Sequence, residues 1–234
     1  MTVLLVLFTL VLFLTVDHFV QKRQSGLAVA QHAGRARNRK PGQVQIPGGV
    51  SLVTNHTWVK SNPDGTITIG LDEFLSRIVG AIKTITLPQH GSKVSSGSNT
   101  LALGIHGRSL HVASPASGQV VELNPEVLTD PSLVMNDPYG TGWLMRIKSG
   151  EGEPAVSREF LVGRPVEWLR EQAALVRDFL VSHVQHGAPA MSQEGGLPAE
   201  GALQQFNGEV WKEFADAFVT LHPSIEVEAN EVRK

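Results

Sequence analysis

Cysteine is absent from this sequence, and neither sign of charge is in large excess. Without cysteine the chain can form no disulfide and no thiolate zinc site, and it has no cysteine nucleophile. Its 20 basic and 22 acidic residues give a net charge of -2, which offers no overall attraction to nucleic acid or anionic lipid. The lack of cysteine fits a reducing compartment, and nucleic acid is not an expected partner.

Sequence motifs of nucleotide and nucleophile chemistry are also missing. The chain contains no Gly-x-Gly-x-x-Gly pattern, no phosphate loop and no Gly-x-Ser-x-Gly elbow. Its aspartates and glutamates are dispersed, without an evident acid–base pair. We therefore expect no catalytic residues and no enzymatic activity.

A long apolar run opens the chain, because residues 1–16 carry no charge. A membrane span needs about 17–25 residues, so the run would extend through Val20. A cleaved signal peptide would begin with a basic n-region, which this sequence lacks. The candidate cleavage site, Ala28-Val29-Ala30, also lies too far from the apolar run. A buried core helix would show a polar face, and this segment has none. The pattern favours a single uncleaved transmembrane anchor over residues 1–21, which contacts membrane lipid through residues 1–20.

Basic residues follow this run and none precedes it: Lys22, Arg23, Arg35, Arg37, Arg39 and Lys40. The positive-inside rule then predicts a single-pass membrane protein with its N-terminus outside and the bulk of the chain in the cytoplasm. The same basic stretch could be a solvated linker that touches anionic headgroups. Residues 22–49, with two prolines and a Gly-Gly pair, are expected to form a flexible linker.

Short alternating runs replace this pattern from Val50. Residues 51–60 and 66–70 suit strands on either side of the strong turn signal Asn62-Pro63-Asp64-Gly65. Residues 72–79 fit one short helix with acids in its first turn and Gly80 as its stop. Its apolar side comprises Leu71, Phe74, Leu75 and Ile78. Residues 82–88 suit another strand.

Five short motifs follow one another in this region: His56-Thr57-Trp58, Ile69-Gly70-Leu71-Asp72, Leu87-Pro88-Gln89-His90-Gly91, Pro115-Ala116-Ser117-Gly118, and NDPYGTGWL at residues 136–144. Their order and spacing resemble the H protein of the glycine cleavage system, a lipoyl carrier of the biotinyl/lipoyl hammerhead type. The resemblance implies an α+β, mainly β fold over residues 50–149, in the form of a hammerhead-like lipoyl-domain β sandwich. His56 and Trp58 are then expected to be packing residues of the opening strand.

The same resemblance indicates where a lipoyl group would be attached. In that family a hairpin tip displays a lysine in a motif resembling Glu-Ser-Val-Lys, eight residues before the Pro-x-Ser-Gly turn. Counting back eight from Pro115 gives Gly107, and the motif is replaced by Gly104-Ile105-His106-Gly107. Gly107 has no amine to acylate, and the nearest lysines, Lys83 and Lys93, fall outside the tip. We therefore expect a degenerate carrier that holds no lipoyl cofactor.

The hairpin tip itself can survive this loss, because its glycines allow the positive φ of a tight turn. Ile105, His106 and Arg108 would then be presented at the tip. They could form a fixed docking knob for a protein partner, or the turn could have drifted once the cofactor was lost. No metal site is expected, since the spacing of His90, His106 and His111 matches no zinc pattern.

Two apolar periodic segments lie in an extension over residues 150–234, separated by a breaker-rich linker at 187–201. The first begins with Pro165 at its first helical position and has an apolar stripe of Val166, Leu169, Ala173, Val176, Leu180 and Val184, widened by Trp168, Leu175 and Phe179. His183 and His186 would close this helix. The second segment is marked by Leu203, Phe206, Val210, Phe214, Phe218 and Leu221 and ends at His222-Pro223.

These amphipathic helices could pack on the β domain, on each other, on the bilayer surface or on another subunit. We expect packing within the chain, with a partner protein as the second choice, because neither helix has the basic polar face of a membrane-surface helix.

The whole pattern predicts a non-catalytic, unlipoylated, H protein-like accessory or assembly subunit tethered to the membrane. It would dock the protein partners of a membrane-associated complex, which the usual service of lipoyl carriers suggests is a redox complex. The alternative is an active lipoyl-type carrier that shuttles aminomethyl, acyl or sulfur groups on a non-standard lysine. A small-molecule binding module is a third possibility, for which the sequence offers no polar pocket signature.

Overall fold

The computed structural model describes residues 46–150, 156, 158–184 and 199–221 of the chain. The predicted anchor over residues 1–21 and most of the predicted linker lie outside these residues. Within the described ranges no helix is both long and apolar enough to cross a membrane. The division into four segments therefore stays a prediction.

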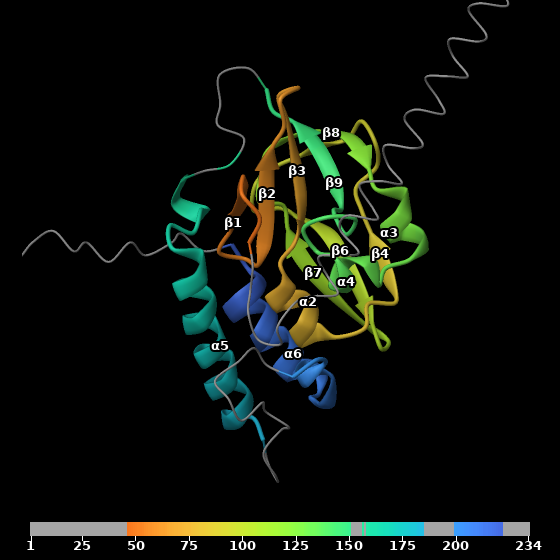
Figure 1. Ribbon diagram of the computed structural model, residues 1–234. Coiled ribbons are helices and arrows are strands. Elements are labelled where there is room, and N and C mark those ends of the chain that lie inside the picture. Colours follow the sequence, from red (N-terminus) through yellow and green to blue (C-terminus); the bar gives the residue numbers. More distant parts are fainter. Residues whose placement is uncertain (1–45, 151–155, 157, 185–198, 222–234) are drawn as a thin grey trace, which may run out of the picture. The chain divides into compact units, whose positions relative to one another are not determined.

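Two antiparallel sheets dominate the described fold (Figure 1). The larger sheet has the strand order β1-β2-β3-β9-β8-β5, and the smaller has the order β4-β6-β7. The strands are β1 (Val50–Leu52), β2 (Thr57–Ser61), β3 (Thr66–Leu71), β4 (Thr84–Thr86), β5 (Lys93–Val94), β6 (Asn99–Ile105), β7 (Arg108–Ala113), β8 (Gly118–Leu123) and β9 (Met145–Lys148). The predicted α+β, mainly β sandwich is confirmed.

Strands β1, β2 and β3 form two consecutive hairpins, of which the sequence predicts only the second. The turn between β2 and β3 is the predicted one, and Gly65 adopts a φ of 78° in it. The prediction of one strand over residues 51–60 is wrong, because the chain turns between β1 and β2. In that turn the His56 N–H donates to the Val53 carbonyl at 3.0 Å, and the Val53 N–H donates to the Thr57 carbonyl at 2.9 Å.

The predicted short helix is confirmed as α2, Glu73–Val79. Asp72 is its N-cap, and its carboxylate accepts a hydrogen bond from the Leu75 N–H at 2.8 Å, as N-cap side chains do. Gly80 ends the helix with a φ of 73°. The strand predicted over residues 82–88 is shorter, since only β4 pairs with β6, with Ile85 opposite Leu103.

The short helices α3 (Pro125–Thr129) and α4 (Leu133–Asn136) lie between β8 and β9. They lead into the NDPYGTGWL motif, whose Asp137 carboxylate accepts a hydrogen bond from the Thr141 N–H at 2.8 Å. The Trp58 indole N–H donates to the Pro138 carbonyl at 3.0 Å. The opening and closing motifs are therefore directly joined.

The C-terminal extension forms the short 3-10 helix η1 (Arg158–Phe160), the helix α5 (Pro165–Ser182), the 3-10 helix η2 (Ala202–Gln205), the helix α6 (Gly208–Phe214) and the π-helical turn η3 (Ala215–Val219). Pro165 stands at the start of α5 as predicted. Val166 and Leu175 are 39% and 53% exposed, so the apolar stripe is narrower than predicted. The second predicted helix is interrupted, because Phe206 is extended and Asn207 caps a new helix.

Both helical segments pack on the chain's own β domain, as expected. Buried residues of α5, η2, α6 and η3 belong to the same hydrophobic core as those of the two sheets (Figure 1). The Gln204 side-chain amide donates to the Val79 carbonyl at 2.9 Å, and the Gly201 N–H donates to the Arg77 carbonyl at 2.9 Å. The ring of Phe179 on α5 contacts those of Phe214 and Phe218.

Candidate functional site at the β6–β7 hairpin

The hairpin of β6 and β7 is the candidate functional site. The two strands pair with Leu103 opposite Leu110 and with Ile105 opposite Arg108. Only His106 and Gly107 therefore lie in the turn, with φ angles of 46° and 78°. Two consecutive residues with positive φ are typical of the type I′ turn, which matches the twist of the strands that it joins.

The three predicted tip residues differ in their exposure. His106 is exposed and Arg108 is half-buried. The expectation that Ile105 is presented at the tip is wrong, because this side chain is 0% exposed. Side chains alternate across a strand, and Ile105 therefore shares the buried face of β6 with Leu101 and Leu103.

Gly107 has open space around it. A Cβ built on this residue would meet no heavy atom within 4 Å. Gly104 differs, since a Cβ there would collide with the Thr84 hydroxyl oxygen on β4. The backbone of Gly104 is also turned toward β4, because its carbonyl accepts a hydrogen bond from the Lys83 N–H at 2.8 Å. A small residue is thus required at Gly104, whereas a side chain at Gly107 would project into solvent.

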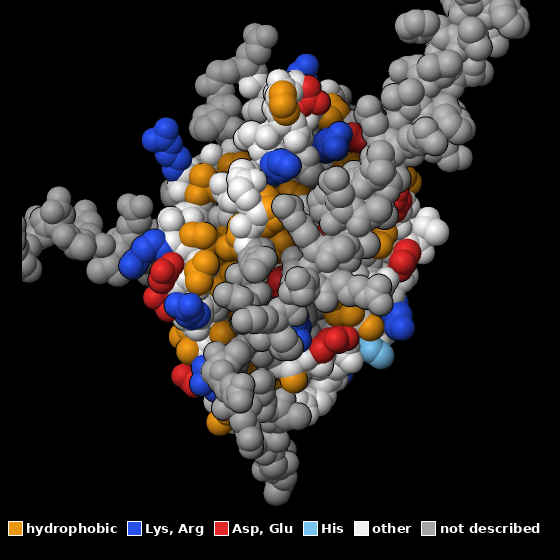
Figure 2. All heavy atoms as spheres, in the orientation of Figure 1, with side chains coloured by type: hydrophobic (Ala, Val, Ile, Leu, Met, Phe, Trp, Pro, Cys, Tyr) orange, Lys and Arg blue, Asp and Glu red, His pale blue; other side chains and the backbone are white. Residues whose placement is uncertain are grey.

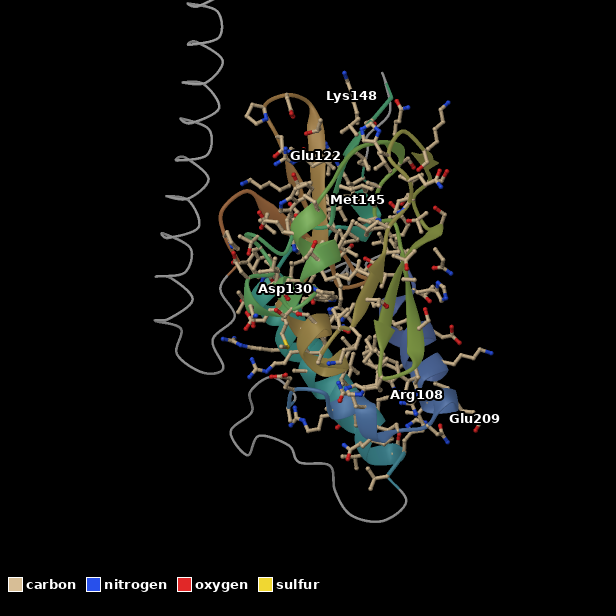
Figure 3. All side chains as sticks on the ribbon, turned by 90° about the vertical axis from the view of Figure 1, so that its right-hand side faces the viewer. Arg108, Glu122, Asp130, Met145, Lys148 and Glu209 are labelled. Carbon is tan, nitrogen blue, oxygen red and sulfur yellow. The ribbon has the colours of Figure 1, made fainter. Side chains whose placement is uncertain are left out.

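The segment formed by α6 and η3 lies beside β7 of the same hairpin (Figure 3). The guanidinium carbon of Arg108 lies 5.6 Å from the centre of the Trp211 ring on α6, a distance at which a cation is attracted to the face of an aromatic ring. Trp211 is 5% exposed. Its indole N–H is buried without a hydrogen-bond partner within the described part of the chain. No motif or apolar period in the sequence predicts this contact.

A groove of about 460 Å³ lies between β7 and the helical segment formed by α6 and η3. Arg108, Ser109 and His111 line it from β7, and Trp211, Lys212 and Asp216 line it from the helices. Among these six residues, Arg108 and Lys212 carry a positive charge and Asp216 carries a negative one. Ser109 and His111 both line the groove, and no hydrogen bond joins their side chains in the described part of the chain.

His56 and Asp72 form a second polar arrangement, away from the hairpin. Their side chains are fully buried, and the His56 Nδ1 lies 2.8 Å from an Asp72 carboxylate oxygen. The imidazole lies between the rings of Phe74 and Trp168, with centroid distances of 4.7 and 4.8 Å. The packing role expected of His56 is confirmed, although it lies in the turn before β2. Its Trp168 neighbour comes from α5, so the pair is covered by the extension.

The remaining histidines do not form a metal centre in the described residues. No group of three or more histidine, aspartate or glutamate side chains there is placed to hold a metal ion. His90, His106 and His111 are exposed, and the last two belong to the hairpin.

His183 ends α5 as predicted, with Nδ1 2.8 Å from the Phe179 carbonyl and Nε2 2.9 Å from a Glu213 carboxylate oxygen. The pKa of His183 is raised, first by the Phe179 carbonyl and then by Glu213. His186 lies outside the described residues.

Comparison with known proteins covers the β-rich region and the start of the extension. The family model described as "Glycine cleavage H-protein" matches residues 50–162. The glycine cleavage system H protein of Pseudoalteromonas atlantica is 34% identical over 108 residues, which are 46% of this chain and 84% of that protein. The H protein of Thermobifida fusca is 33% identical over 112 residues, which are 48% of this chain and 87% of that protein. The chain belongs to the glycine cleavage H-protein family.

A solved H-protein structure is similar as well. The crystal structure of the glycine cleavage system H protein from Mycobacterium marinum is 29% identical, covers 55% of this chain and 99% of its own, and has a TM-score of 0.47.

The H-protein match accounts for the hairpin but not for the helices beside it. The match ends at residue 162, and α5, η2, α6 and η3 all follow it. The groove beside β7 therefore has one wall inside the matched region and one wall beyond it. The H protein is a lipoyl carrier rather than a catalytic enzyme, and the hairpin tip of this chain presents His106 and Gly107.

Proposed function

We propose that this chain is an unlipoylated H-protein family member that serves as a membrane-tethered accessory or assembly subunit. Its hairpin would dock protein partners of a membrane-associated complex, and the usual service of lipoyl carriers suggests that the complex is a redox one. No catalytic residue is assigned. The residues 1–20 would contact lipid, and the bulk of the chain would lie in the cytoplasm.

One observation carries the proposal: a two-residue turn is kept where the family resemblance expects the lipoyl-lysine, and Gly107 fills that position. Lipoyl attachment forms an amide with a primary amine, and Gly107 offers no side chain at all. The guanidinium of Arg108 stays protonated and lies over the Trp211 ring. A tip of this kind can contact another protein but cannot carry a group between active sites.

The rigidity of the tip supports docking over drift. Ile105 is buried in the core and Gly104 packs against Thr84, so both sides of the turn are fixed. His106 is exposed in a left-handed conformation, which non-glycine residues adopt rarely. A fixed, pre-ordered loop loses little conformational entropy on binding, and this favours recognition of a partner.

The intact mass of the chain tests the proposal. After expression in a host that lipoylates its own proteins, we expect the unmodified mass. Gly107→Lys is the matched variant, because a side chain there has open space. The cost of a positive φ for a residue with a Cβ is about 1–2 kcal/mol. Any lipoyl increment on the unchanged chain contradicts the proposal, whereas an increment on Gly107→Lys alone shows that only the amine was missing.

The alternative function, an active carrier with a non-standard lysine, has one supporting observation. Lys83 is exposed and its backbone N–H is bonded to Gly104 in the hairpin. If a lipoyl increment were found, peptide mapping and the Lys83→Arg variant would identify the site. Loss of the increment in Lys83→Arg, but not in Lys93→Arg, would establish this carrier.

A further inference from the structure

The Arg108 guanidinium is held in position without an acceptor of its own. Its central carbon lies 5.6 Å from the centre of the Trp211 ring, and Trp211 is 5% exposed, so a buried ring covers one face of the planar group. Within the described residues no carboxylate, carbonyl or hydroxyl accepts a hydrogen bond from Arg108. A guanidinium has five N–H donors in its plane, and stacking on an aromatic ring leaves them available. Such a pre-positioned cation is suited to binding an oxyanion.

Other donors line the groove to which Arg108 belongs. Lys212 lines it from α6, Ser109 and His111 line it from β7, and Asn99 lines it from the start of β6. All four are exposed, and in the described part of the chain none of their side chains has a hydrogen-bond or ion-pair partner. Residues two apart on a strand share a face, so Ser109 and His111 are neighbours. The groove thus combines a stacked guanidinium with an ammonium group and neutral polar groups.

The charge and the size of the groove indicate what it can hold. Asp216 is the acidic residue among those that line it, against the positive charges of Arg108 and Lys212. The volume of about 460 Å³ lies within the range of small-molecule sites. Leu110 and Val219 add apolar surface to the lining. A small organic molecule with one strongly anionic group fits this combination better than a cation does.

Phosphate suits these donors better than a carboxylate. A phosphate monoester carries a charge of about -1.5 to -2 near neutral pH and has three strong acceptor oxygens. It can therefore contact Arg108 and Lys212 together and still accept a hydrogen bond from Ser109. Arginine binds phosphate through two parallel N–H groups, and lysine binds it as a point charge. A carboxylate, with a single charge and two oxygens, would balance only one of the two cations.

We propose that the groove between β7 and the segment formed by α6 and η3 binds a phosphate monoester. Its phosphate lies at Arg108 and Lys212, and its small carbon skeleton lies along Leu110 and Val219. One wall follows the end of the H-protein match at residue 162, so the carrier domain alone would not provide this site. The inference goes beyond the docking function and does not depend on it. Two sources share this chemistry: a soluble phosphate monoester and the headgroup of a lipid such as phosphatidic acid.

Calorimetric titration of the full chain, in detergent and buffer that contain no phosphate, tests the inference. The probe is glycerol 3-phosphate, and glycerol is its control without the phosphate. We expect saturable binding of glycerol 3-phosphate and none of glycerol at the same concentration. The probe should also shift the side-chain NMR signals of His111 and Trp211, because both residues line the groove.

Two variants locate the phosphate. Arg108→Lys keeps the charge but loses the planar fork, so affinity should fall about tenfold. Arg170→Lys, the same exchange at an exposed position of α5, should leave affinity unchanged. Lys212→Gln removes an exposed charge and should also weaken binding about tenfold, whereas Lys60→Gln, on β2 of the other sheet, should not. Thermal unfolding checks that each variant keeps the fold, and Lys212→Gln decides the test if Arg108→Lys does not.

Bilayer discs distinguish the two sources of the phosphate. Discs that contain phosphatidic acid should compete with glycerol 3-phosphate if the groove binds a headgroup, and Arg108→Lys should remove this competition. Discs with phosphatidylglycerol, which is anionic but has no phosphate monoester, control for charge repulsion. Equal binding in both kinds of disc assigns the site to a soluble molecule, and either result supports a phosphate site.

Two results would overturn the inference. One is that glycerol 3-phosphate binds no better than glycerol does. The other is that Arg108→Lys and Lys212→Gln both leave its affinity unchanged, because the phosphate would then lie elsewhere on the chain. The mass measurement decides the docking function separately, since a lipoyl increment would refute that function whatever the groove binds.

Discussion

Trp58 and Gly70 form a tightly constrained contact between two of the motifs. Trp58 is 1% exposed, and its indole N–H is bonded to the Pro138 carbonyl. A Cβ on Gly70 would lie 2.5 Å from two atoms of that ring. The two residues pair directly across β2 and β3. Three of the sequence motifs are thus held together by one indole ring.

The variant Gly70→Ala should therefore be strongly destabilised. The ring is fixed by its hydrogen bond and by burial, so it cannot move away from an added methyl group, and overpacking of this kind costs about 1–3 kcal/mol. Thermal and urea unfolding measure the change. Gly163→Ala is the control, because nothing lies within 4 Å of its Cβ position. Equal stability of the two variants would show that the Trp58 ring is free to shift.

Single residues also show how far sequence reasoning reaches. Asp72, Gly80 and Pro165 were predicted as helix boundaries, because capping chemistry is local and depends on few neighbours. Ile105 was placed wrongly, although Leu101, Leu103 and Ile105 alternate as one strand face. The predicted tip included Gly104 and Ile105, whereas the turn itself contains only His106 and Gly107. Trp211 beside Arg108 could not be predicted, since it depends on how a distant helix packs.

At the scale of elements, α5 and α6 are linked by the His183–Glu213 pair. His183 is the C-cap of α5, and its two ring nitrogens face the Phe179 carbonyl and the Glu213 carboxylate. Both partners are acceptors, so the doubly protonated imidazolium satisfies both. This explains why the pKa of His183 is raised above its ordinary value of 6.5.

The pair should make stability depend on pH. Because the folded pKa is raised, its contribution is fully present below pH 6.5 and is lost as the pH rises through the folded pKa. Glu213→Gln should therefore lower the free energy of unfolding at acidic pH by less than about 1 kcal/mol, since Glu213 is largely exposed. The difference from the unchanged chain should shrink toward alkaline pH. Urea unfolding at several pH values measures it.

Glu209→Gln is the control for this experiment. Glu209 is an exposed acid in the first turn of the same helix (Figure 3), so its removal weakens a favourable helix-dipole interaction. That loss does not involve His183 and should stay constant between neutral and alkaline pH. A constant difference for Glu213→Gln as well would show that the pair has no part in the pH dependence.

The interruption of the second C-terminal helix has a similar explanation. Asn207 accepts a hydrogen bond from the Val210 N–H at 3.1 Å, which is an N-cap signal that the sequence offers. The apolar period of Leu203, Phe206 and Val210 obscured it, because all three are buried on either side of the break. The π-helical turn over Ala215–Val219 has no comparable sequence signal, and it contacts β7.

At the scale of the whole chain, the charged side chains that can be placed in the described part are mixed in sign. On the face shown in Figure 2, basic and acidic side chains are interspersed. The polar side of α5 also mixes the two signs, with Arg164, Glu167, Arg170 and Glu171 exposed. Membrane-surface helices need a basic polar face beside a broad apolar one. The proposed membrane attachment is therefore assigned to residues 1–21, whose uncharged run the sequence provides.

Extraction from membranes tests this dependence. The full chain should stay in the membrane pellet after washing with alkaline carbonate, whereas a chain that begins at residue 22 should be released. An uncharged run of sixteen residues, extended through Val20, is long enough to span a bilayer, and its cost of leaving the hydrocarbon greatly exceeds any surface attraction. Replacing Leu10 and Leu12 with arginine gives the matched control, because it keeps the length of the run and destroys its hydrophobicity. Release of the full chain by carbonate, or retention of the arginine variant, would show that the first residues do not form an anchor.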